Sequence, residues 1–126
     1  MGILKDLNPL GSDDTTSSGV KRINPRKVRF SQESVSYRFS HGAGTISDLA
    51  DALRSGQVRP EDVPPIRLVE RDGSLFTLDN RRLEAFRRAG VDVPYRMATP
   101  EEIAREVWEF TTRNYGVSVR VRGEPK

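Results

Sequence analysis

The sequence feature that most constrains the fold is a pair of short apolar runs separated by Asp-Gly. Ile66–Val69 and Leu75–Leu78 are rich in aliphatic and aromatic side chains, and Asp72-Gly73 lies between them. Asp-Gly readily adopts the left-handed backbone conformations of a tight turn. The stretch therefore predicts a β-hairpin.

A helix is predicted directly after the hairpin. Asp79 or Asn80 can cap its first turn. Apolar residues then recur at helical spacing until a glycine ends the pattern: Leu83, Phe86, Ala89 and Gly90. The hairpin thus delivers the chain into a helix N-terminus, where backbone N–H groups are free.

Three further extended segments are predicted. Lys27–Phe30 and Val117–Val121 alternate polar and apolar residues, which is typical of half-buried strands. Val93–Arg96 is a short extended segment that follows the helix predicted to end at Gly90. The last strand would carry one basic face, because arginines alternate with its valines.

Capping signals predict two more helices. Thr45 and Asp48 have the spacing of a capping box, and the apolar pattern runs over residues 46–55. Thr99 is expected to cap a last helix that starts at Pro100. Its apolar positions are Ile103, Ala104, Val107, Trp108 and Thr111, and we expect Trp108 and Phe110 to be core rather than a base-stacking platform. The fold class is α+β: a small domain with a mixed sheet, a central hairpin and about three helices.

Composition indicates one small domain. The chain has 126 residues, 35% of them hydrophobic, which suffices for one core but not for a second full domain. It has no Cys, which excludes disulfides, thiol catalysis and Cys-bound zinc. No apolar run reaches the ~20 residues of a membrane helix and no signal peptide is visible, so we expect no membrane partner. Residues 1–19 predict a flexible N-terminal linker and 20–126 the folded domain.

Positive charge is concentrated in residues 21–40. The whole chain has 21 Lys and Arg against 18 Asp and Glu, whereas this stretch has six Lys or Arg and one Glu. Arg26, Lys27 and Arg29 form a basic patch that suits the phosphates of a nucleic acid. The alternative is an ordinary solvated surface.

Polar residues that follow the basic patch are further candidates for substrate binding. Ser31, Gln32 and Ser34 can bind a phosphate or a base edge through hydroxyl and amide groups, or can simply form turns. His41 is the only histidine and lies among glycines. It is either a loop residue or a general base or phosphate contact that closes over the site.

The join between the hairpin and its helix is a candidate anion site. Free N–H groups and the helix dipole favour an anion there. Arg81 and Arg82 in the first turn can add a bidentate grip on phosphate. The alternative is that Asp79 only caps the helix and the two arginines face solvent.

The segment Pro64–Pro94 resembles the N-terminal module of ParB proteins and the related sulfiredoxin fold. In that family a hairpin leads into a turn with two basic residues, then a helix ending in Ala-Gly, then a Val-Pro strand. Asn24-Pro25 resembles the family's first block, and the resemblance covers about residues 23–97. It implies a catalytic or nucleotide-binding module with Arg82 at the family's most constant position.

The chain departs from that family at three points. Sulfiredoxins carry a Cys in the turn, and its absence here excludes sulfinic-acid repair. Asn80 stands where partition proteins have Glu, and 126 residues cannot also hold their helix-turn-helix domain. We therefore expect the isolated module, with Asp79 as a nearby carboxylate.

A ParB-like domain behind a polar linker is similar to the nuclease tips of bacterial polymorphic toxins, including Rhs-type effectors; the block Arg29–Ser34 also resembles these versions. The resemblance implies a secreted nuclease that hydrolyses nucleic acid, expected to be DNA, in the cytoplasm of a target cell, or a cytoplasmic protein. It also implies an immunity protein with an acidic face as partner. The expected catalytic residues are Asp79, Asn80, Arg81 and Arg82, in a cleft shared with Arg29. Asp79 would orient water, Arg82 or a metal.

Several alternatives remain open for the same anion site. It could bind or transfer phosphate from CTP or ATP, or serve another nucleotide-consuming toxin chemistry such as ADP-ribosyl transfer. A non-enzymatic interaction domain is also compatible with the residues. No metal ligands are assigned, although Mg²⁺ held by one or two carboxylates and substrate phosphate fits the pattern.

Overall fold

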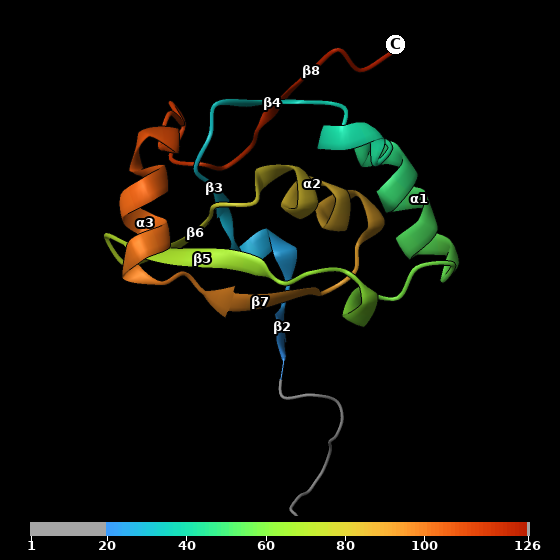
Figure 1. Ribbon diagram of the computed structural model, residues 1–126, viewed down its shortest axis with the longest axis horizontal. Helices are drawn as coiled ribbons and strands as arrows, with labels where there is room; N and C mark the ends of the chain where they lie inside the picture. The colour runs from blue at the N-terminus through green and yellow to red at the C-terminus, as the bar shows by residue number, and fades with distance from the viewer. Residues whose placement is uncertain (1–19, 126) are drawn as a thin grey trace, which may run out of the picture.

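The computed structural model describes residues 20–125, apart from the side chain of Glu109. The expected linker 1–19 lies outside the described residues, as does Lys126 at the end of the expected domain. The described part is an α+β domain with three α-helices, a mixed five-stranded sheet and a two-stranded sheet (Figure 1). The predicted fold class is confirmed.

The elements follow in this order: β2 (Lys21–Ile23), 3-10 turn η1 (Pro25–Lys27), β3 (Arg29–Phe30), β4 (Ser34–Ser36), η2 (Ser40–Gly42), α1 (Ile46–Ser55), η3 (Pro60–Asp62), β5 (Ile66–Arg71), β6 (Ser74–Thr77), α2 (Asn80–Ala89), β7 (Val93–Met97), α3 (Pro100–Glu106), η4 (Val107–Glu109) and β8 (Arg120–Arg122). The larger sheet has the strand order β2-β7-β5-β6-β3. β2/β7 and β5/β6 are antiparallel, whereas β5/β7 and β3/β6 are parallel. The smaller sheet pairs β4 with β8 in parallel.

The predicted hairpin is confirmed as β5 and β6. Asp72 and Gly73 both have positive φ, 53° and 81°, as a tight two-residue turn requires. The register pairs Leu68 with Thr77, and the N–H of Leu78 donates to the carbonyl of Arg67. This register places Arg67 beside the residue that follows Leu78, which is Asp79.

Helix α2 lies between the two sheets (Figure 1). Leu83 and Phe86 pack into the core over the five-stranded sheet, while Ala85 packs with Val35 of β4 and Ile46 of α1. Both faces of α2 are therefore covered. The mid-helix residues Leu83, Ala85 and Phe86 are fully buried, and the site is built around the two ends of the helix.

The predictions for α1 and α2 hold, with one correction. α1 spans the predicted residues 46–55, and the Thr45–Asp48 capping box is formed. α2 ends at Gly90 as predicted, but its N-cap Asp79 makes no capping hydrogen bond within the described residues. The Asp79 carboxylate is instead taken up by Arg67. Asp79 thus occupies the predicted N-cap position, but the prediction that its side chain caps the helix was wrong.

Three other expectations need correction. The stretch 27–30 is not a continuous strand, because η1 includes Lys27 and the strand starts at Arg29. α3 ends at Glu106, and Trp108 in η4 is 70% exposed rather than core, because the helix stops before its pattern can bury the indole. The last strand begins at Arg120 rather than at Val117.

Candidate functional site

A pocket of about 280 Å³ lies at the N-terminus of α2, where β6 ends and α3 passes alongside; we call it the polar pocket. It is lined by Gln32, Phe39, Arg67, Leu78, Asp79, Asn80, Arg81, Arg82 and Glu106. All four residues predicted as catalytic thus line one pocket.

Asp79 holds two guanidinium groups in place. Its Oδ2 accepts hydrogen bonds from the backbone N–H and the Nε of Arg67, at 2.8 and 3.1 Å. Its Oδ1 accepts from Nη2 of Arg67 at 2.9 Å and lies 2.8 Å from Nη2 of Arg82. Three hydrogen bonds from Arg67 and the ion pair with Arg82 engage both carboxylate oxygens, so Asp79 positions the two arginines rather than a water molecule.

The electrostatics of Asp79 agree with this role. Burial raises the pKa of Asp79, but the hydrogen bonds from Arg67 and the charge of Arg82 outweigh burial and hold this pKa below its ordinary value. The carboxylate is therefore ionised at neutral pH and paired on both sides.

Arg81 and Arg82 present guanidinium groups to the polar pocket. Nη1 of Arg82 donates to the carbonyl of Pro64 at 2.7 Å, while its Nη2 pairs with Asp79. Arg81 donates to the carbonyl of Arg38 at 2.9 Å and lies over the ring of Phe39. Each arginine has five N–H donors, so donors remain for an anion.

Arg67 and Glu106 were missed by the sequence reasoning. Nη1 and Nη2 of Arg67 donate to the two oxygens of Glu106, at 2.6 and 3.1 Å. Each Glu106 oxygen thereby keeps a lone pair. The register of the hairpin could have placed Arg67 beside Asp79. The spacing of Glu102 and Glu106, which puts both on one helix face, was a weaker signal for a carboxylate in the site.

Asn80 is a buried residue that secures the loop after β3. Its Oδ1 accepts from the N–H groups of Ser31 and Gln32, at 2.9 and 3.3 Å, and its Nδ2 donates to Oγ of Ser31 at 3.0 Å. Ser31 is fully buried. The expectation that Ser31 contacts substrate was wrong, because its hydroxyl is enclosed and bonded to Asn80.

Replacing Asp79 by Asn should lower the free energy of unfolding by about 3 kcal/mol at pH 7, because the half-buried Arg82 loses its carboxylate partner and Arg67 keeps only that of Glu106. The folded-state pKa of Asp79 lies below the unfolded one. Its contribution is therefore full above about pH 4 and is lost as the pH falls further. Urea unfolding at pH 7 and at acidic pH measures both effects.

The matched control is Asp51→Asn, which removes a carboxylate paired with Arg54 at 2.8 Å but 72% exposed. This change should cost under about 0.5 kcal/mol at any pH. Equal losses for the two variants would contradict a structural role for the Asp79 network.

A second pocket, of about 620 Å³, lies beside η1 and β3; we call it the basic pocket. It is lined by Arg26, Lys27, Arg29, Gly73, Ser74, Leu75, Arg87 and Val117, and none of these described residues is acidic. The basic patch predicted from residues 21–40 thus borders a concave site. Among the described residues the two pockets share no lining residue. The prediction that Arg29 shares a cleft with Asp79 to Arg82 was therefore wrong, because α2 separates them.

Arg87 is the fixed cation of the basic pocket and was not predicted. Its guanidinium donates to the carbonyls of Pro25, Val28 and Val117 and lies 4.6 Å from the centre of the Phe30 ring. Burial lowers the pKa of Arg87, and the neighbouring charges of Arg26 and Arg29 act in the same direction. A bound anion would relieve this repulsion.

Ser34 and His41 lie outside both pockets, among the residues that the structure describes. The hydroxyl of Ser34 accepts from Nε of Arg122 in the smaller sheet. His41 lies exposed in η2 with a φ of 59°. Their predicted roles in substrate binding find no geometric support, whereas Gln32 does line the polar pocket.

Within residues 20–125, no three metal-ligating side chains gather in one place. In the same range, every helix is too short or too polar to cross a membrane.

Comparisons with protein-family models, curated proteins and solved structures find no match to this chain.

Proposed function

We propose that this protein is a nuclease that binds the phosphates of a nucleic acid in the basic pocket and hydrolyses a phosphodiester bond at the polar pocket. One observation carries the proposal: four cations line the basic pocket, with no acidic residue among its described lining. Such a concentration of positive charge favours a polyanion.

The placement of the pockets favours a polymer over a free nucleotide. The polar pocket is lined by the first turn of α2 and the basic pocket by Arg87 in its last turn. The helix rises about 10 Å between Asn80 and Arg87. A nucleic-acid backbone can reach both ends, whereas a volume of about 280 Å³ is small for a whole nucleotide.

The polar pocket offers the groups that hydrolysis needs. Arg81 and Arg82 would hold the scissile phosphate and stabilise its developing charge. Water attacks phosphorus and gives a proton to Glu106, the carboxylate that keeps lone pairs free. The bond from phosphorus to the leaving sugar oxygen breaks, and that oxygen takes a proton from solvent. Asp79 keeps the arginines in position.

The resemblance to ParB-like toxin tips supports the same function and suggests its setting. The protein would act in the cytoplasm of a target cell. An immunity protein with an acidic face would bind over the basic pocket and block access of nucleic acid. Both statements rest on the resemblance and on the charge of Arg26, Lys27 and Arg29.

The direct test is incubation of the purified chain with labelled DNA and RNA, single-stranded and duplex, with Mg²⁺ or with a chelator. We expect shortened products from at least one polymer. Free CTP and ATP serve as parallel substrates. Intact polymers in every condition would refute the nuclease proposal, and consumption of the nucleotides alone would favour the nucleotide-dependent alternatives.

Binding should depend on the basic pocket. Replacement of Arg26, Lys27 and Arg29 by Ala should weaken nucleic-acid binding and reduce the slope of log K against log salt by roughly 0.7 to 0.9 per lost phosphate contact. Titrations at several salt concentrations measure both quantities.

A matched variant removes three cations elsewhere: Arg22, Arg54 and Arg59, which pair with Glu61, Asp51 and Asp62. Its net charge is the same as that of the first variant. We expect a much smaller loss of affinity. Equal losses would mean that net charge, not the basic pocket, governs binding.

A further inference from the structure

Two aromatic side chains are left exposed: Tyr115 accepts a backbone hydrogen bond from a residue of the basic pocket, and Trp108 follows a residue of the polar pocket by two positions. The chain has five Phe, three Tyr and one Trp, all within the described residues, and the other seven are buried or half-buried. Tyr115 is 81% exposed and Trp108 is 70% exposed. Exposed rings of this kind offer flat apolar faces on which a ligand can stack.

Tyr115 lies at the rim of the basic pocket. Its carbonyl accepts a hydrogen bond of 3.0 Å from Nη1 of Arg29, and Val117, two residues on, lines the pocket. Tyr115 has a φ of 57°, a conformation that bulky residues rarely adopt. The strained turn thus carries an exposed aromatic side chain on a residue whose backbone is bonded to the cationic Arg29.

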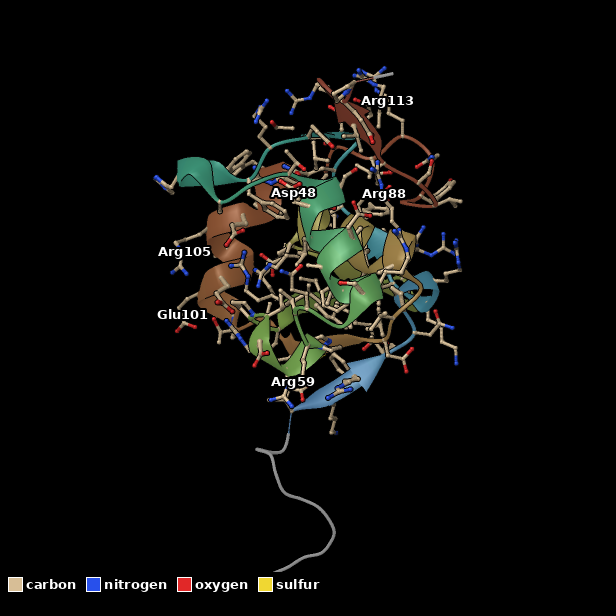
Figure 2. All side chains as sticks on the ribbon, turned by 90° about the vertical axis from the view of Figure 1, so that its right-hand side faces the viewer. Asp48, Arg59, Arg88, Glu101, Arg105 and Arg113 are labelled. Atoms are coloured by element: carbon tan, nitrogen blue, oxygen red, sulfur yellow. The ribbon has the colours of Figure 1, made fainter. Side chains whose placement is uncertain are left out.

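Trp108 lies in the turn that directly follows helix α3. It follows the pocket residue Glu106 by two positions, in η4. Its Nε1–H donates to the carbonyl of Arg105 at 2.8 Å, so the polar edge of the indole is satisfied within the chain. Figure 2 shows the Arg105 side chain pointing outward from α3, on the turn that precedes Trp108.

We infer that the substrate is a single-stranded nucleic acid, whose unpaired bases stack on Tyr115 and Trp108 while its phosphates enter the adjacent pockets. This inference rests on the proposed function and narrows it. Alternation of cations and exposed aromatic rings is the pattern by which proteins bind single strands without reading sequence. In a duplex the base faces are already stacked and cannot meet the rings.

Trp108 is the only tryptophan, so fluorescence excited at wavelengths where the three tyrosines do not absorb reports on it alone. The probes are a short single-stranded oligonucleotide, the same sequence as a duplex, and the single strand with abasic positions. We expect the single strand to quench the fluorescence and to bind about tenfold or more tightly than the duplex or the abasic strand. The abasic strand keeps the phosphates and loses only the stacking.

Substitutions then test each ring, with anisotropy of a labelled oligonucleotide as the readout. Trp108→Leu and Tyr115→Asn should each weaken binding of the single strand by about 5- to 150-fold and leave the abasic strand unaffected. Trp108→Phe should retain most of the affinity. Tyr115→Asn should keep its thermal stability, because Asn tolerates the left-handed conformation.

The outcomes separate this inference from the proposed function. Equal binding of duplex and single strand without quenching, or variants that bind like the original, would overturn the inference but leave a nuclease that acts through the basic pocket. Binding with quenching but no cleavage would uphold the inference and refute the nuclease. Failure to bind any nucleic acid would refute both and would assign the exposed rings to a protein partner.

Discussion

Arg82→Lys is expected to lower the rate of phosphodiester cleavage about 10²- to 10³-fold while the domain stays folded. Arg82 spans the carbonyl of Pro64 and the carboxylate of Asp79 with two different nitrogens, at 2.7 and 2.8 Å. A lysine ammonium cannot span both partners and still present donors to a phosphate. Single-turnover cleavage of a labelled oligonucleotide measures the rate, and thermal unfolding checks the fold.

The control for this change is Arg22→Lys. Arg22 also pairs with a carboxylate, that of Glu61 at 3.1 Å, but it lines neither pocket. Its replacement should leave the cleavage rate within about twofold. If Arg82→Lys also stays within that range, charge stabilisation by Arg82 is not part of the reaction.

Gly116→Ala is expected to destabilise the domain by at least about 3 kcal/mol. Gly116 has a φ of 73°, and a Cβ there would overlap the carbonyl oxygen of Phe30 and lie 2.8 Å from its nitrogen. The clash would also break the 2.9 Å hydrogen bond from the Phe30 N–H to the Gly116 carbonyl. Urea unfolding of the variant measures the loss.

Gly123→Ala isolates the effect of this close approach. Gly123 has a similar φ of 82°, but a Cβ there would meet nothing within 4 Å. Only the backbone strain remains, so we expect a loss of about 1 kcal/mol. Equal losses at the two positions would show that the segment around Gly116 can move away from β3.

Local signals explain why much of the fold could be predicted from the sequence. The Asp72-Gly73 turn, the Thr45 and Thr99 caps and the terminal Gly90 each act within a few residues, and each appears where it was predicted. Prediction failed where a residue distant in the sequence competes with the local partner for the same side chain. Asp79 has the chemistry of a cap, yet the hairpin register brings Arg67 to its carboxylate.

Part of the candidate site could also be predicted, because some of its residues are neighbours in the chain. Arg81 and Arg82 follow one another in the chain and share the polar pocket, as the first turn of a helix implies. Glu106 reaches that pocket from 39 residues beyond Arg67, through tertiary packing that no local pattern encodes. Trp108 was misjudged because the helical pattern continues past the residue where α3 ends.

Because α2 is packed on both faces, it acts as a rigid spacer between the polar pocket and the basic pocket. Its first turn lines the polar pocket and Arg87 lines the basic pocket, and the rigid rise of about 10 Å between Asn80 and Arg87 sets the separation of the two pockets. A strand anchored at Arg87 and cut near Arg82 would therefore be cut at a constant distance from its anchored phosphates. The position of the cut would then be dictated by the length of one helix and not by the order of the bases.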